Sequence, residues 1–223
     1  MPAVGFTTIF DAARQRHGAG AIEARLPHPK TASELAATPD DRYLSQMSLR
    51  VFRAGLKHSL VDAKWPAFEE VFVGFDPRRI RAMPDEALEK LLGDARLIRH
   101  WGKLKSIRDN AAAMLAIAEE FGSFGSWLGT WPGSNIVELW DALGGRFSQM
   151  GGASGPMFLR MVGKDTFVLS QSVIAALKHW AELPPPKNRK DRAAAQACFN
   201  AWGAESGLPL SQMSLILALS VDD

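Results

Sequence analysis

The sequence is poor in the residues that form covalent or metal cross-links. Among its 223 residues it has one cysteine, Cys198, which can form neither an intrachain disulfide nor a thiolate zinc site. The five histidines are scattered, and no two lie three or four residues apart, the spacing at which a helix presents metal ligands. We therefore expect neither a metal nor a cofactor.

Long apolar runs and targeting signals are also missing. No apolar run approaches the ~20 residues that span a bilayer. The N-terminal sequence MPAVGFTTIF has no basic leader before its apolar stretch, which is unlike an export signal. A lone cysteine fits a reducing compartment. We expect a cytoplasmic protein without a membrane partner, and a monomer.

Positive charge is concentrated in two segments, although the net charge is only +2. Residues 78–108 contain nine lysines and arginines against four acids, and a second basic cluster, KNRKDR, occupies residues 187–192. Such clusters are typical of surfaces that bind a polyanion such as nucleic acid, and they also occur on the solvated faces of helices. Charge alone leaves both interpretations open.

Helical periodicity dominates the chain, and the alternation typical of strands is nearly absent. The longest predicted helix, Leu97 to Phe121, buries a stripe that includes Leu104, Ile107 and Ala111. The Gly/Ser/Trp-rich residues 122–135 are expected to form a loop. About ten short helices and no strand predict an all-α fold; the helices are expected at 40–57, 64–72, 76–83, 84–92, 97–121, 136–142, 156–162, 170–182, 191–205 and 210–221.

Two adjacent glycines, Gly151 and Gly152, lie between two of these helices. They allow a tight turn whose backbone N–H groups point outward beside Ser154 and Gly155, at the start of the second helix, which is the simplest form of a phosphate site. Because Gly155 follows Ser154 directly, this is not the G-x-S-x-G turn of a serine nucleophile. An ordinary interhelical turn has the same pattern and remains the alternative.

We call this glycine turn and the helix that follows it, residues 148–165, the hairpin. Three short motifs accompany the hairpin elsewhere in the chain. They are an AGL step at residues 54–56, an FDP helix start at residues 75–77, and an IRH-x-GK-x-x-x-I-x-x-NA helix at residues 98–111. Together they resemble the 3-methyladenine DNA glycosylase I family of the helix-hairpin-helix DNA glycosylase superfamily. The resemblance covers residues 40 to 180, most of the chain.

The resemblance implies a two-lobed helix-hairpin-helix glycosylase fold. Residues 41–162 would form the helical lobe that ends in the hairpin, and residues 1–40 and 163–223 would form the second lobe from both termini. The implied activity is that of a base-excision repair enzyme, which flips an alkylated purine out of double-stranded DNA and hydrolyses its N-glycosidic bond. No lysine nucleophile starts the second hairpin helix, so we expect a monofunctional enzyme.

The resemblance also assigns roles to individual residues. Gly55 and Leu56 would fill the gap that the flipped base leaves in the stack, although Leu56 packed in the core is the alternative. The remaining predicted contacts fall into two groups. Arg50, His58 and Trp65 would line the base pocket, while the phosphate contacts would be Arg99, Lys103, Lys105 and the hairpin residues Gly151, Gly152, Ser154 and Gly155.

The chain departs from the family at chemically important positions. Family members carry a glutamate and a tryptophan where this sequence has Arg50 and His58, and a cation there would repel cationic 3-methyladenine. Where relatives such as endonuclease III place a catalytic aspartate, this chain reads SQS at residues 170–172. Asp165 is therefore the candidate catalytic residue, with a helix cap as the alternative, and Asp62 is a second candidate carboxylate.

Two other functions remain open at the level of sequence. The chain is either a glycosylase, a catalytically silent DNA-binding relative that recognises damaged or bent duplex, or a helical protein-interaction module whose basic segments are solvated surface.

Overall fold

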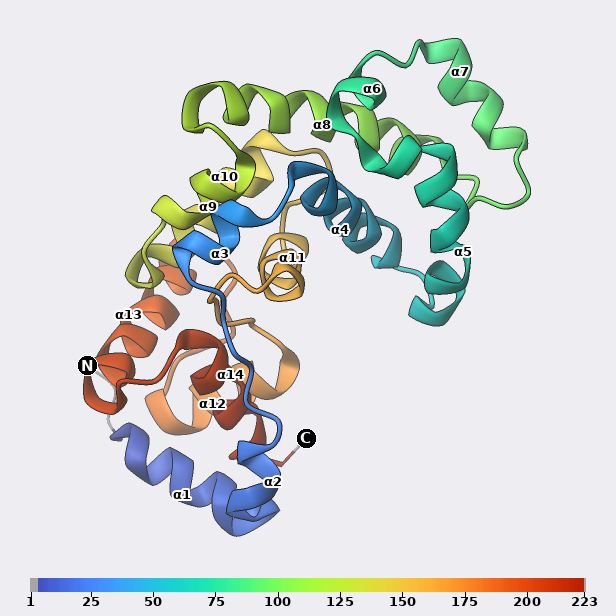
Figure 1. The fold of residues 1–223 in the computed structure, drawn as a ribbon. Coiled ribbons are helices and arrows are strands. Elements are labelled where there is room, and N and C mark those ends of the chain that lie inside the picture. The colour runs from blue at the N-terminus through green and yellow to red at the C-terminus, as the bar shows by residue number, and fades with distance from the viewer. Residues whose placement is uncertain (1–3, 223) are drawn as a thin grey trace. The chain divides into compact units, whose positions relative to one another are not determined.

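The computed structural model describes residues 4–222, and within them the chain is helical with no β-strand (Figure 1). This confirms the all-α fold predicted from periodicity. Residues 1–3 and 223, at the ends of the expected terminal lobe, lie outside the described residues. The α-helices are α1 (Phe6–His17), α2 (Ala19–Glu23), α3 (Ala32–Ala37), α4 (Asp40–Arg53), α5 (His58–Val71), α6 (Pro77–Arg81), α7 (Asp85–Lys90), α8 (Trp101–Phe121), α9 (Phe124–Thr130), α10 (Ile136–Arg146), α11 (Ser154–Val162), α12 (Gln171–Ala181), α13 (Arg189–Ser206) and α14 (Leu210–Leu219).

The chain divides into two compact units. Unit 1 contains the chain up to Lys30, Pro132–Leu139 and the chain from Gly163, and unit 2 contains Thr31–Trp131 and Trp140–Val162. Helix α3 precedes the lobe boundary expected at residue 41, but it packs against α9 and so belongs to unit 2. Each unit therefore combines segments that are distant in sequence.

Unit 1 is built around α13 and α14, which are joined to the N-terminal helix α1. The rings of Phe167 and Phe199 stack with their centroids 4.1 Å apart, and Trp202 is fully buried beside them. The carboxylate of Glu205 accepts hydrogen bonds from the backbone N–H groups of Phe6 (2.9 Å) and Thr7 (3.3 Å), so it caps α1. These contacts tie the two ends of the sequence together in one core.

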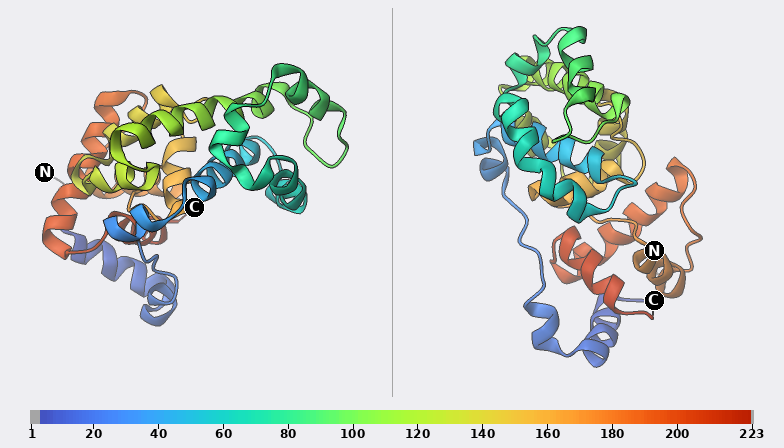
Figure 2. Two further views of the ribbon diagram at one scale, coloured as in Figure 1. Left: turned by 45° about the horizontal axis from the view of Figure 1, so that its top comes forward. Right: turned by 90° about the vertical axis from the view of Figure 1, so that its right-hand side faces the viewer.

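Unit 2 is organised around α8, against which α4, α6 and α9 pack (Figures 1 and 2). Its apolar stripe is buried as the sequence predicts, since Leu104, Ile107 and Ala111 have no exposed surface. A cluster of aromatic rings packs beside α4 and continues through its neighbour α5: Phe52, Trp65, Phe68, Phe72 and Phe75. Helix α8 therefore lies at the centre of unit 2, and the aromatic cluster packs between α4 and α5 beside it.

The observed helices depart from the predicted ranges at several boundaries: α5 begins at His58 rather than at residue 64, and α1, α2 and α3 precede the first predicted helix. Two of these departures lie beside the sequence motifs. Helix α4 ends at Arg53 rather than at residue 57, because Gly55 adopts a left-handed conformation with φ +76°. Helix α8 begins at Trp101 rather than at Leu97, since His100 is extended and its Nδ1 accepts the N–H of Lys103 as an N-cap. Both differences place irregular backbone beside the motifs of the AGL step and the IRH…NA helix.

The loop predicted at residues 122–135 contains a helix, so that prediction was wrong. Ser123 caps α9 by accepting the N–H of Ser126 at 2.9 Å. The glycines that suggested a loop serve close packing instead, because a Cβ at Gly125 would lie 2.1 Å from the carbonyl oxygen of Leu35. Glycine is therefore required where α9 meets α3.

Within residues 4–222, no helix combines the length and apolar character needed to cross a bilayer. The same residues contain no group of three His, Cys, Asp or Glu side chains arranged to hold a metal ion.

Candidate nucleic-acid interface

The AGL step forms an exposed tip between α4 and α5. Helix α4 closes with the N–H of Ala54 bonded to the carbonyl of Arg50 (3.2 Å), and Gly55 then reverses the chain. A Cβ at Gly55 would meet no atom within 4 Å, and Leu56 is 36% exposed. The core-packing alternative for Leu56 is thus disfavoured, and the tip projects an apolar side chain into solvent.

The side chain of Lys103 binds the backbone of this tip. Its Nζ donates to the carbonyl oxygens of Ala54 (2.7 Å) and Phe52 (3.3 Å), and the residue is only 8% exposed. Burial, and then the charge of Arg50, lowers the pKa of Lys103. The prediction that Lys103 contacts a phosphate is therefore corrected, because its ammonium group satisfies the C-terminal carbonyls of α4.

The glycine hairpin lies between α10 and α11 and is held by α8. The side chain of Asn110 accepts the N–H of Ser148 (2.7 Å) and donates to its carbonyl (3.2 Å). About two turns nearer the start of α8, the carbonyl oxygen of Gly102 accepts a hydrogen bond from Nε2 of Gln149 (2.8 Å). Sequence reasoning did not assign Asn110 or Gln149 a role, although Asn110 is the asparagine of the IRH…NA motif.

The four predicted hairpin residues divide into two kinds. Gly151 and Gly152 are exposed, and among the hydrogen bonds of the described residues none uses their N–H groups. Ser154 and Gly155 are buried, and a Cβ at Gly155 would lie 3.2 Å from the carbonyl oxygen of Met150. Only the first pair is placed to bind a phosphate, whereas Gly155 allows the hairpin to close.

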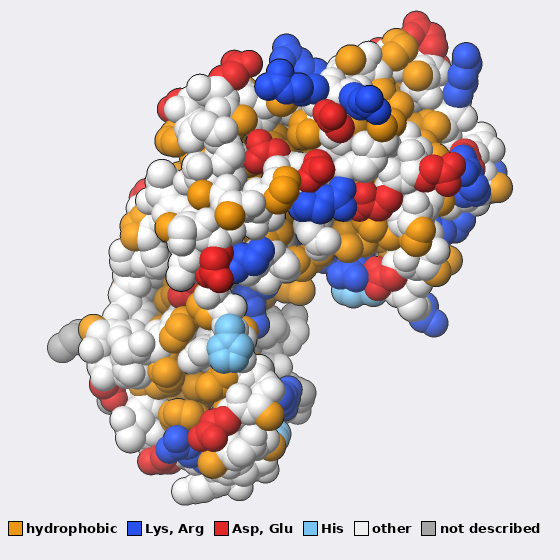
Figure 3. Space-filling view, in the orientation of Figure 1, with side chains coloured by type: hydrophobic (Ala, Val, Ile, Leu, Met, Phe, Trp, Pro, Cys, Tyr) orange, Lys and Arg blue, Asp and Glu red, His pale blue; other side chains and the backbone are white. Residues whose placement is uncertain are grey.

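The remaining predicted phosphate contacts differ in availability. Arg99 is exposed on the segment before α8 and forms no ion pair among the described residues. Lys105 is exposed on α8, but its Nζ lies 2.8 Å from a carboxylate oxygen of Asp109. On the face drawn in Figure 3, lysine and arginine side chains are interspersed with aspartate and glutamate. Arg99 is consequently the better phosphate ligand of the two.

The structure does not bring the three predicted pocket residues together. Trp65 stacks on Phe68 with centroids 4.9 Å apart and donates its Nε1 to Ser45 (3.1 Å). At about 100° per residue, Ser45 lies about 140° around α4 from Arg50. His58 is exposed at the first turn of α5. Trp65 therefore belongs to the aromatic cluster on another side of α4, which corrects its assignment to the base pocket, while Arg50 and His58 stay predicted pocket residues.

Arg50 has an unusual environment. Its Nε is buried without a hydrogen-bond partner in the described structure. Burial, and then the charge of Arg53, lowers the pKa of Arg50. A desolvated guanidinium without a carboxylate is unfavourable for protein stability and for any cation that approaches it.

The two candidate carboxylates are both engaged. The oxygens of Asp165 accept the backbone N–H groups of Leu210 and Ser211, each at 2.9 Å, so this residue caps α14 within unit 1. Asp62 pairs with Arg53 at 2.8 Å. Ser170, at the helix start where relatives such as endonuclease III have a catalytic aspartate, caps α12 by accepting the N–H of Val173. The capping alternative for Asp165 is the one that these contacts support.

Comparison with known proteins locates the similarity in the central chain. Residues 35–144 match the family model described as methyladenine glycosylase. DNA-3-methyladenine glycosylase 1 of Escherichia coli K12 is 34% identical over 82 residues, which are 37% of this chain and 44% of that protein. The match therefore spans less than half the length of this relative.

Solved structures resemble the chain over a larger part. A crystal structure of 3-methyladenine DNA glycosylase I (TAG) is 27% identical in sequence and superposes with a TM-score of 0.51. The match covers 65% of this chain and 86% of the chain in that structure. The 8-oxoguanine glycosylase/lyase of Methanocaldococcus jannaschii, solved with DNA that contains 8-oxoguanine, is 14% identical, with 95% and 94% coverage and a TM-score of 0.54. The latter likeness shows the fold alone, which is the helical fold of DNA glycosylases.

Proposed function

We propose that the protein is a DNA glycosylase of base-excision repair, on the premise that residues 35–144 match the methyladenine glycosylase family model. It flips a damaged base out of double-stranded DNA and hydrolyses the N-glycosidic bond without a metal or cofactor. Unit 2 is the lobe that carries the hairpin, and unit 1 is the lobe formed by both termini.

The arrangement around the start of α8 is the observation that carries this proposal. Lys103 holds the AGL tip, and its neighbour Gly102 holds the glycine hairpin through Gln149. The amides of Gly151 and Gly152 bind a DNA phosphate, and Leu56 enters the stack where the base has left. One rigid helix thus fixes the phosphate ligand relative to the apolar wedge.

An alkylated purine is the substrate that the names of the relatives support, since the matching E. coli protein is a DNA-3-methyladenine glycosylase. Such a base is cationic in DNA and is already a good leaving group. Its release needs stabilisation of the sugar cation and a positioned water more than a strong acid. This chemistry is compatible with the absence of an unengaged carboxylate at Asp165 and Asp62.

A catalytically silent DNA-binding protein is the second candidate function. It is favoured by the capping contacts of Asp165 and Ser170, which leave the helix start where relatives such as endonuclease III have a catalytic aspartate without a carboxylate. This candidate keeps the hairpin and the Leu56 tip for recognition of damaged or bent duplex.

Base release from methylated DNA tests both candidates. The enzyme is expected to release 3-methyladenine, and an Asp165→Asn variant is expected to retain that activity per folded molecule because the residue is a cap. Absence of base release by the wild type, together with duplex binding that weakens steeply with salt, would replace the enzyme by the silent binder. Absence of salt-dependent duplex binding would exclude both. The monomeric state and the cytoplasmic location remain predictions.

A further inference from the structure

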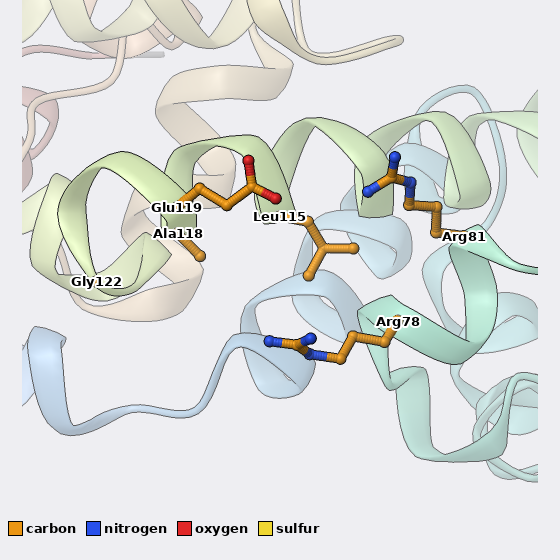
Figure 4. A pocket seen from close by; sticks show the side chains of 6 residues that line it. All are labelled: Arg78, Arg81, Leu115, Ala118, Glu119 and Gly122. Carbon is orange, nitrogen blue, oxygen red and sulfur yellow. The ribbon is translucent and has the colours of Figure 1, made fainter.

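A groove of about 380 Å³ lies between α6 and α8 in unit 2. It is lined by Arg78, Arg81, Leu115, Ala118, Glu119 and Gly122. Figure 4 shows the two arginine side chains on either side of Leu115, with Glu119 further along α8. No residue of this groove takes part in the AGL tip or in the hairpin.

The arginines of this groove carry charge that the described structure does not neutralise. Arg78, Arg79 and Arg81 are exposed on a helix of five residues. Asp76 accepts the backbone N–H groups of Arg78 and Arg79, but among the described residues no guanidinium group of the three forms an ion pair. Two nearby arginines behave differently, because Arg96 pairs with Asp94 and Glu70, and Arg108 pairs with Asp85. The lining of the groove therefore carries a net positive charge, from two arginines and the one carboxylate of Glu119.

The floor of the groove is apolar. Leu115 and Ala118 are half-buried on α8, and the helix ends at Gly122, which has no side chain and a φ of +84°. A ligand that matches this surface carries negative charge at two points and an aliphatic group between them. Glu119 adds a negative charge at one end of the floor, which disfavours a uniformly anionic ligand.

The groove lies away from the proposed DNA contacts. A rise of about 1.5 Å per residue places Glu119 about 24 Å along α8 from Lys103, and at about 100° per residue it lies about 180° around the helix from Asn110. Lys103 and Asn110 hold the tip and the hairpin. Distance and direction favour a protein segment over the duplex as the occupant.

We propose that the groove between α6 and α8 docks a short acidic segment of a partner protein. Arg78 and Arg81 bind two of its carboxylates, and an aliphatic side chain between those carboxylates packs on Leu115 and Ala118. This site is separate from base excision, so it would attach the protein to a partner while the hairpin and the tip hold DNA.

A short fluorescein-labelled peptide that alternates glutamate and leucine is the probe, and fluorescence anisotropy measures its binding to the full chain. The wild type is expected to bind, and the double variant Arg78→Glu/Arg81→Glu is expected to bind at least about tenfold more weakly. Arg79→Glu is the matched control, because Arg79 lies on the same helix with the same charge but does not line the groove. A peptide with serine in place of leucine is expected to bind more weakly than the original.

Four outcomes would overturn the proposal. They are no binding of the leucine peptide to the wild type, an equal loss of binding in the Arg79→Glu control, equal binding of the serine peptide, and an equal loss of duplex affinity in the Arg78→Glu/Arg81→Glu variant. The last would assign the groove to DNA. The substituted side chains are exposed, so matching thermal unfolding curves will show that the variants are folded.

Discussion

The ammonium nitrogen of Lys103 donates a 2.7 Å hydrogen bond to the carbonyl oxygen of Ala54, so the lysine of the IRH…NA motif holds the alanine of the AGL step. Two motifs that are separated by about 40 residues of sequence therefore form one structural element. A cation near the C-terminus of α4 also interacts favourably with the helix dipole.

Replacing Lys103 by methionine tests this assignment. The variant leaves the carbonyls of Ala54 and Phe52 without their charged donor, so the free energy of unfolding is expected to fall by about 2 kcal/mol. Lys105→Met is the control, because its exposed pair with Asp109 contributes less than about 1 kcal/mol. Urea denaturation measures both. Equal stability of the two variants would return Lys103 to the phosphate contacts.

Leu56→Ala is expected to impair base flipping without affecting the fold. The side chain is exposed, so the unfolding free energy should change by less than about 0.5 kcal/mol. Loss of the wedge makes the flipped state less stable, and the fluorescence rise of a 2-aminopurine placed at the target position should shrink several-fold. Val73→Ala, which shortens another exposed apolar side chain of unit 2, should behave like the wild type. Similar signals from the two variants would contradict the wedge.

Arg50→Gln is expected to increase the release of 3-methyladenine. The substitution removes a desolvated cation, and with it the repulsion of a cationic base, so kcat/KM should rise at least about fivefold. Release of a neutral base such as hypoxanthine should change less. Arg53→Gln is the control, because the charge of Arg53 is already paired with Asp62. A fall in 3-methyladenine release in the Arg50 variant would show that the guanidinium binds substrate.

The cap of α1 predicts a dependence of stability on pH. The backbone N–H groups of Phe6 and then Thr7 lower the pKa of Glu205 below its usual 4.5. A depressed pKa means that the carboxylate stabilises the fold above pH 4.5, and that this stability is lost as the pH falls through the folded-state value. The wild type should therefore be more stable than Glu205→Gln at pH 7, and the difference should vanish in acid. Denaturation curves from pH 7 to pH 3 measure it, and a constant difference would refute the cap.

The sequence predicts much of the fold because the long helices follow local rules. The stripe of Leu104, Ile107 and Ala111 is sufficient to predict α8, whereas the predicted helix at 40–57 runs past Gly55, whose left-handed conformation follows the end of α4. Helix α9 was missed because its glycines are determined by a distant neighbour, the carbonyl of Leu35, which periodicity cannot reveal.

The site was predictable only in part, because several of its side chains find their partners far away in the sequence. Sequence indicates that Lys103 is charged but not that its ammonium group turns inward to the end of α4. Asp165 finds its partners at Leu210 and Ser211, 45 and 46 residues later, so its capping role depends on tertiary contacts. By contrast, Leu56, Gly151 and Gly152 are exposed as predicted, since tight turns project their residues outward.

Two adjacent residues of α8 hold the AGL tip and the hairpin, since Lys103 binds Ala54 and Gly102 binds Gln149. The distance between the tip and the hairpin is therefore fixed by one helix. Gly102 and Lys103 are adjacent in one helix, so in the proposed function the protein sets the span between the bound phosphate and the inserted leucine. On that proposal, a lesion is tested by whether the duplex can bring a gap to this span. Stiff, well-stacked steps resist this deformation, whereas steps that a damaged base has already weakened comply with it.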